Sequence, residues 1–216
     1  MISSQIGSLD KIFLGGLQNG IITEISGLRG TGKTHFALQF AIEPLRNNNK
    51  ILFIDTTVEF RPERFLQMLH SRNLSTSLLE NLHVSRVTNT QKQTEILTNF
   101  NDHNFSLLII DNITDLFAFE YSKKEQTIEK NLNFGNYMIN LSKLALSKNI
   151  PIIITNQILS YDKKNYERMH TQLENYVHQK IQLEKIKKYY TCKITSPFIH
   201  ETKVHYKITN FGIEET

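Results

Sequence analysis

Residues 27–34 read Gly-Leu-Arg-Gly-Thr-Gly-Lys-Thr and match the pattern G-x-x-x-x-G-K-[ST]. An apolar run, residues 21–26, precedes this segment, and residues 35–45 after it have the apolar spacing of a helix. Glycines let a backbone curl so that its N–H groups point at phosphate oxygens, and a helix N-terminus adds partial positive charge. In such a loop Lys33 can reach the β- and γ-phosphates, and the Thr34 hydroxyl can bind Mg²⁺. The segment therefore predicts a phosphate-binding loop between a strand and a helix.

The rest of the chain alternates strands and helices in the same way. Residues 51–55, 107–111 and 151–156 are apolar almost throughout, which is typical of parallel strands buried on both faces. Helices are predicted from Pro62, because proline suits a first turn, and over residues 132–146. This alternation predicts an α/β fold with a mostly parallel central sheet flanked by helices.

The last third of the chain has a different pattern. Three short β-rich runs follow one another without intervening helices, which predicts an antiparallel extension at a sheet edge: residues 181–186, 190–195 and 203–208. Residues 119–131 and 160–179 are polar and weakly periodic, so they are interpreted as long loops. Loops of such length are usually functional or disordered.

Length and charge limit the alternatives. With 216 residues and no linker-like tract, residues 1–216 are expected to form a single domain. The net charge of +4 permits a nucleic-acid partner without requiring one. No apolar run is long enough to span a bilayer, and no signal peptide is recognisable, so no membrane association is expected. The lone Cys192 excludes an intramolecular disulfide framework and fits a reducing, cytoplasmic location.

A nucleotide site also needs a carboxylate that holds Mg²⁺ through water at the end of a neighbouring strand. Asp111 directly follows the apolar residues 107–110 and is the preferred candidate. Asp55 ends residues 51–54 in the same way and remains a weaker alternative.

These features resemble the RecA/RadA recombinase family, and in particular its short archaeal RadB-like branch. Matching blocks occur in the family's order along nearly the whole chain. They are Gly7-Ser8-Leu9-Asp10, Gly15-Gly16-Leu17, the phosphate loop, Ile54-Asp55-Thr56 with Phe60-Arg61-Pro62-Glu63-Arg64, residues 108–114 through Glu120-Tyr121, Thr155-Asn156-Gln157-Ile158, Cys192-Lys193-Ile194 and Ser196-Pro197. The resemblance implies a RecA-like P-loop NTPase core.

The resemblance also implies a cofactor, ATP with Mg²⁺, and roles for individual residues. Arg64 would stack on adenine, with a solvated helix arginine as the alternative, and Gln157 would sense the γ-phosphate unless it makes only a loop hydrogen bond. Thr34 and Asp111 would hold the metal, the latter through water, and Lys33, Glu59 and Gln157 are the catalytic candidates. The full set of cofactor-binding candidates is Gly27, Leu28, Arg29, Gly30, Thr31, Gly32, Lys33, Thr34, His35, Arg64 and Asp111.

Two departures from the family pattern alter the expected activity. The family has its catalytic glutamate directly after Ile-Asp-Thr, where this chain has Thr57, which cannot take a proton from water in that role. Glu59 lies two residues later and would reach the site only through a re-routed loop. The sequence also begins almost directly at the ATPase core, without the family's helical DNA-binding domain or Phe-x-x-Ala segment. A monomer or small oligomer is therefore expected rather than a filament.

The two predicted loops correspond to the DNA-binding loops of the family. Basic residues can neutralise phosphates, and tyrosines such as Tyr161, Tyr166 and Tyr176 can stack on single-stranded bases. Interleaved acidic residues leave a solvated mixed-charge loop as the alternative, and the same ambiguity holds for Lys185, Lys187 and Lys188. The DNA-binding candidates are Lys123, Lys124, Lys130, Lys163, Lys164 and Arg168.

The resulting hypothesis is an ATP-binding recombinase paralogue that assists homologous recombination and DNA repair. Its ATP hydrolysis would be slow or absent, its binding to single-stranded DNA modest, and its protein partner a recombinase or another repair protein. Its location would be cytoplasmic, and nucleoid-associated if it binds DNA. The alternatives are an active DNA-dependent ATPase with strand-exchange activity and a KaiC-like signalling ATPase without a DNA role.

Overall fold

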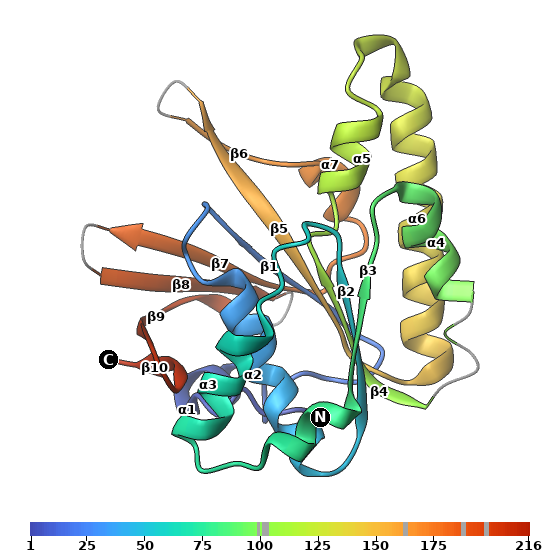
Figure 1. The fold of residues 1–216 in the computed structure, drawn as a ribbon. Helices are drawn as coiled ribbons and strands as arrows, with labels where there is room; N and C mark the ends of the chain where they lie inside the picture. The colour runs from blue at the N-terminus through green and yellow to red at the C-terminus, as the bar shows by residue number, and fades with distance from the viewer. Residues whose placement is uncertain (99, 101–103, 162–163, 187–188, 197–198) are drawn as a thin grey trace.

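A computed structural model describes residues 1–98, 100, 104–161, 164–186, 189–196 and 199–216. Its strands form one sheet in the order β10-β9-β8-β7-β1-β5-β4-β2-β3, with β6 paired to β5 (Figure 1). The strands from β7 to β3 run parallel. They are β1 (Ile22–Gly27), β2 (Lys50–Asp55), β3 (Leu82–Arg86), β4 (Phe105–Asp111), β5 (Ile152–Tyr161) and β7 (Gln179–Ile186).

The antiparallel part of the sheet follows β7. It consists of β8 (Tyr189–Ser196), β9 (Ile199–Thr209) and β10 (Gly212–Glu215). A further strand, β6 (Lys164–Glu167), folds back antiparallel on the distal part of β5. The mostly parallel α/β sheet with an antiparallel C-terminal extension is confirmed.

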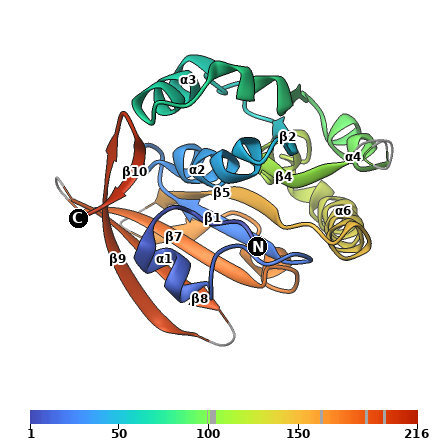
Figure 2. The same cartoon turned by 90° about the horizontal axis from the view of Figure 1, so that it is seen from below.

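Helices cover both faces of the sheet. They are α1 (Gly7–Ile12), α2 (Lys33–Arg46), α3 (Pro62–Ser71), α4 (Thr90–Thr98), α5 (Asp115–Glu120), α6 (Thr127–Lys148) and α7 (His170–Leu173). Figure 2 shows α2 and α3 together on one side of the strands, with α6 well apart from them. Short 3₁₀ turns occupy Thr76–Asn81 and Lys124–Gln126.

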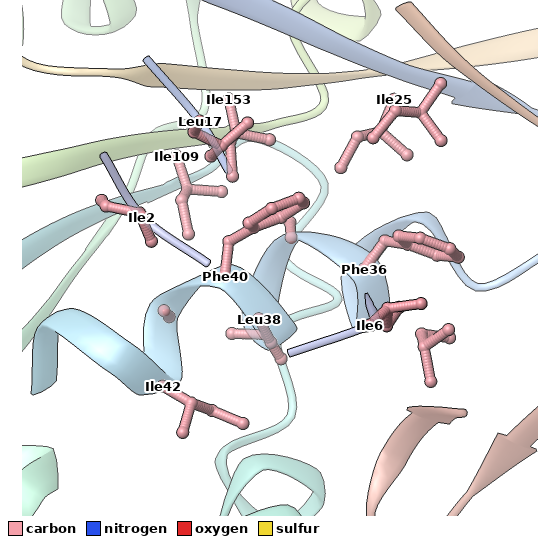
Figure 3. Close-up of a cluster of buried hydrophobic side chains, with 14 of the residues drawn as sticks. Ile2, Ile6, Leu17, Ile25, Phe36, Leu38, Phe40, Ile42, Ile109 and Ile153 are labelled. Carbon is pink, nitrogen blue, oxygen red and sulfur yellow. The ribbon is translucent and has the colours of Figure 1, made fainter. Parts of the chain in front are cut away.

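The period-two alternation of the strands divides the core between the two faces. Ile51 and Phe53 of β2 pack in the cluster that contains α2, whereas Leu52 and Ile54 pack in the cluster that contains α6. Figure 3 shows Phe36 and Phe40 of α2 directed at the sheet residues of the first cluster. Burial of each such side chain contributes about 1.5–3 kcal/mol, so this packing fixes the N-terminus of α2 beside the carboxyl end of β1.

In the part that the structure describes, the two segments interpreted as long loops contain helices and strands, which corrects that expectation. Residues 119–131 contain the end of α5, the 3₁₀ turn and the first residues of α6, which begins at Thr127 rather than Leu132. Within residues 160–179, β5 ends at Tyr161, β6 pairs back on it, and α7 follows. The helix predicted from Pro62 is confirmed as α3.

Among the helices that the structure describes, none has both the length and the apolar character that a membrane crossing requires.

Candidate nucleotide-binding site

The loop between β1 and α2 has the backbone that the glycine pattern predicts. Gly30 and Gly32 have φ angles of +78° and +94°, values that L-residues with side chains rarely adopt. A Cβ atom on Gly32 would lie 2.8 Å from Ile208 Cδ1, and one on Gly27 would lie 2.8 Å from the Leu183 carbonyl oxygen. Because α2 begins at Lys33, its first N–H groups have no partner within the helix and face the loop. The loop is therefore suited to an anion such as a phosphate.

The Lys33 ammonium lies inside the loop. Its Nζ donates hydrogen bonds to the carbonyl oxygens of Gly27, at 3.0 Å, and Leu28, at 3.1 Å. Burial lowers the pKa of Lys33, although the nearby Asp111 carboxylate acts in the opposite direction. A phosphate that accepts hydrogen bonds from this ammonium would give the partly buried cation a negatively charged partner and so offset the cost of its desolvation.

The preferred metal carboxylate contacts the loop threonine directly. The Thr34 hydroxyl donates to Asp111 Oδ2 at 2.6 Å, and the Thr155 hydroxyl donates to Asp111 Oδ1. Asp111 is buried, and this burial raises the pKa of its carboxyl group. A hydroxyl and a carboxylate at the loop's mouth are the hard oxygen ligands that Mg²⁺ takes, so these residues suit the ion.

Asp55, the weaker alternative for the metal carboxylate, accepts hydrogen bonds from backbone N–H groups of the turn after β2. Its Oδ1 accepts the Thr57 N–H at 3.1 Å, and its Oδ2 accepts the Phe60 N–H at 3.1 Å. Arg86 lies 3.8 Å from the same carboxylate. Its hydrogen bonds therefore hold the turn that carries Thr57 and Glu59, whereas Thr34 bonds to Asp111.

A cleft of about 490 Å³ lies over the loop and the ends of β4 and β5. Ten predicted residues from five parts of the chain line it together: Arg29, Gly30, Gly32, Lys33, Thr34, His35, Glu59, Arg64, Asp111 and Gln157. Thr57, Asn112 and Asp115 line it too. Gly27 lies below this surface, where its pairing with Gln157 aligns the loop with the middle of β5, the point at which the parallel pairing of β1 with β5 ends.

Arg64 and His35 meet on the wall that α3 contributes to the cleft. Arg64 Nε donates to His35 Nε2 at 2.6 Å, and the guanidinium also donates to the Thr209 carbonyl at the end of β9. Burial and the Arg64 charge lower the pKa of His35 to about 4, so its imidazole is neutral at pH 7. The stacking of Arg64 on adenine remains a prediction.

Thr57 and Glu59 line the cleft from the turn after β2. The Thr57 hydroxyl donates to Asp55 Oδ1 at 3.1 Å and accepts the Glu59 N–H at 3.2 Å. The Glu59 carboxylate pairs with Arg29 at 3.0 Å, and both side chains are largely exposed, at 63% and 83%. Glu59 therefore lines the cleft while bound to a residue of the phosphate loop, and its carboxylate is held at the solvent side.

A buried charge cluster lies beside the cleft, behind the end of β5. Asn156 Nδ2 donates to Glu24 Oε1 at 2.9 Å, and Lys180 Nζ lies 3.4 Å from Glu24 Oε2 and also binds Glu167. Glu24 is 2% exposed. Burial, together with the Glu167 charge, raises the pKa of Glu24 to about 7, while Lys180 opposes the rise. The cluster joins β1, β5, β6 and β7 next to Gln157.

The DNA-binding candidates lie at two places. Lys123 and Lys124 are exposed between α5 and α6, and Lys130 lies in the first turn of α6. Arg168 follows β6, where its guanidinium pairs with Asp115, so its charge is partly neutralised. Lys164 is the first residue of β6, and Lys163, Lys187 and Lys188 lie outside the described residues.

Sequence reasoning missed the polar residues that support the site. Thr155 was recognised only as part of a block, yet it bonds to Asp111, and the Thr114 hydroxyl bridges Asn112 and Asn156. Their shared signal is position, because each closely follows an apolar run, residues 107–110 or 151–154, whose carboxyl end faces the cleft.

Comparison with known proteins agrees with this geometry. The family model described as Rad51 matches residues 1–216. The chain is 30% identical over 226 residues to the DNA repair and recombination protein RadB of Thermococcus sibiricus, covering 100% of this chain and 95% of that protein. It is 31% identical over 179 residues to the DNA repair and recombination protein RadA of Methanococcus maripaludis strain C5, covering 73% of this chain and 56% of that protein. The RadA protein of strain C6 is 30% identical over the same length and shares.

Proposed function

Because this chain belongs to the Rad51 family, as a short RadB-like member of the RecA/RadA recombinases, we propose that it binds ATP with Mg²⁺ and assists homologous recombination and DNA repair. The names of its relatives support the repair role. The partner on which it acts would be a recombinase or another repair protein.

The contact between Thr34 and Asp111 carries the nucleotide part of this proposal. At 2.6 Å it joins the phosphate loop to the end of β4, the place where a metal bound to phosphates is held. Bound Mg²⁺ would neutralise phosphate charge at the γ-position. The Lys33 ammonium and the first N–H groups of α2 would bind the phosphate oxygens. Arg64 would line the part of the cleft wall that α3 contributes.

Slow turnover follows from the residues of the turn after β2. Hydrolysis requires a group that orients water and takes its proton, and Thr57 has no carboxylate for this purpose. Glu59 is paired with Arg29 at 3.0 Å, so its use as a base would require that pair to separate. Nucleotide would then act as a clamp, with Gln157 transmitting phosphate occupancy to the β5–β6 hairpin. This reasoning disfavours the active strand-exchange enzyme.

Modest binding to single-stranded DNA is proposed for two neighbouring surfaces, the connection between α5 and α6 and the β5–β6 hairpin. Lys123 and Lys124 supply exposed positive charge at the first, and Tyr166 supplies a half-exposed ring at the second. Glu125 and Glu129 beside these lysines limit the affinity.

Isothermal titration calorimetry with MgATP tests the nucleotide site. Lys33→Ala removes the ammonium and Thr34→Val removes the metal ligand, so each is expected to abolish measurable binding. Lys92→Ala, at an exposed position of α4, is the matched control and should bind like the wild type. Wild-type affinity in Lys33→Ala would mean that the loop does not hold the phosphates.

A further inference from the structure

Helix α6 has two apolar faces. The inner face is buried in the core and includes Phe134, Met138, Leu141 and Ala145. The other face exposes large apolar side chains that its own chain leaves uncovered. Their exposed fractions are 75% for Ile128, 63% for Leu132, 39% for Ile139 and 70% for Leu146. Helix α6 runs along one edge of the molecule, away from α2 and α3 (Figures 1 and 2).

These exposed residues belong to a regular pattern, which we call the outer stripe. It comprises Ile128, Leu132, Gly135, Ile139, Ser142 and Leu146, with spacings of four and three residues in strict alternation. The two small members, Gly135 and Ser142, are half-buried, and the Ser142 hydroxyl oxygen is buried within the chain. At a rise of 1.5 Å per residue the stripe extends about 27 Å along the helix. Such a repeat is typical of a seam between two helices, whereas scattered exposed leucines are not.

The sizes of the residues in the stripe are complementary to the same stripe turned end for end. In an antiparallel pair of α6 helices, Ile128 faces Leu146 of the second copy. Leu132 faces the small Ser142, and Ile139 faces Gly135. A Cβ atom on Gly135 would meet no atom within 4 Å, so the helix surface is open there. Leu132 and Ile139 thus each meet a small residue, whereas Ile128 and Leu146 meet each other at the two ends of the seam, on both sides of one two-fold axis.

Charge complementarity selects the same arrangement. Glu129 and Lys143 flank the stripe on one side, fourteen residues apart, at corresponding positions of the repeat. In the antiparallel pair Glu129 lies beside Lys143 of the second copy, and symmetry repeats this contact. In a parallel pair, Glu129 would lie at the same level as Glu129 of the second copy and far from Lys143. Both contacts between Glu129 and Lys143 would then be lost.

We propose that the outer stripe of α6 is a self-association surface, and that its occupant is α6 of a second copy of this chain, antiparallel and related by a two-fold axis. The proposal is independent of nucleotide binding, because no stripe residue lines the nucleotide cleft. It identifies the small oligomer as a dimer with one symmetric helix pair at its centre.

Sedimentation equilibrium over a range of protein concentrations tests the charge pairing. Lys143→Glu converts two attractive contacts into two repulsive ones, so the dimer dissociation constant should rise about tenfold. Glu129→Lys with Lys143→Glu restores both pairs with reversed sign and should return most of the affinity. Lys92→Glu makes the same change of charge on α4 and should have no effect.

A second variant keeps the test independent of misfolding. Gly135→Gln replaces glycine inside a helix at an open position, so it should raise the melting temperature of the monomer. The same change fills the space for Ile139 of the second copy and should lower self-association at least tenfold. A wild-type chain that stays monomeric at about 100 µM would refute the proposal, as would a double charge swap no better than Lys143→Glu alone.

Discussion

Glu24 provides a test of the buried cluster that adjoins the cleft. The side chain is 2% exposed, and burial raises its pKa to about 7 from an ordinary value of 4.5. An acid whose pKa is raised on folding contributes stability that is complete below the unfolded pKa. That contribution is lost as the pH rises through the folded pKa. Glu24→Gln cannot ionise, so the variant should lack this loss.

The expected magnitude follows from the two pKa values. Each unit of difference in pKa corresponds to about 1.4 kcal/mol once the group is fully ionised in both states. For 4.5 against about 7, the loss is about 1 kcal/mol at pH 5.5 and about 3 kcal/mol at pH 8.5. The free energy of unfolding of Glu24→Gln relative to the wild type should therefore increase by about 2 kcal/mol between these two pH values.

Urea denaturation of both proteins at pH 5.5 and pH 8.5 measures this difference directly. The comparison removes the titration of shared groups that do not interact with Glu24. Glu95→Gln, at an exposed position of α4, is the control and should show no change with pH. A difference between Glu24→Gln and the wild type that stays constant within about 0.5 kcal/mol would show that Glu24 does not titrate in this range.

Two further predictions concern the loop and the DNA surface. Gly32→Ala places a side chain at φ +94° and a Cβ atom 2.8 Å from Ile208 Cδ1. Urea denaturation should therefore show a free energy of unfolding about 1–2 kcal/mol lower than that of the wild type, and ATP should bind more weakly. An unchanged free energy of unfolding would contradict the strained loop. Reversal of charge in Lys123→Glu/Lys124→Glu should weaken binding to single-stranded DNA and reduce its salt dependence. Binding then neutralises fewer phosphates, so fewer counterions are released. Lys163→Glu/Lys164→Glu tests the second surface in the same fluorescence anisotropy titrations. If affinity and salt slope stay at the wild-type values in either pair, that surface is not part of the DNA site.

The parts of the fold that sequence reasoning predicted are those with strong local patterns. The buried strands are continuous apolar runs, and α3 begins at Pro62, where a proline favours a first turn. In contrast, α4 was missed because its buried residues include Thr90 and Gln93, so it lacks an apolar stripe. The edge strand β3 is at most half-buried along its length and pairs only with β2 among the described strands, so its sequence alternates weakly.

The candidate site divides in the same way. Its phosphate loop lies within eight consecutive residues, and glycine, lysine and threonine are each required there by local geometry. The contacts that complete it join distant residues, as Thr34 does with Asp111 and Arg29 with Glu59. Glu24 and Lys180 are 156 residues apart and meet only because β1 pairs with β7. No local pattern encodes such pairs, so they require the sheet order.

The strongest test of the proposed slow turnover is the rate of phosphate release from MgATP by the wild type, Thr57→Glu and Glu59→Gln. Removal of a catalytic general base typically costs about 10²–10⁴-fold in rate, so the wild type should hydrolyse ATP very slowly while still binding it. Thr57→Glu should raise the rate, because it places a carboxylate where the family has one, and Glu59→Gln should change little. A fast wild-type enzyme whose activity collapses in Glu59→Gln would contradict this and would identify Glu59 as the base.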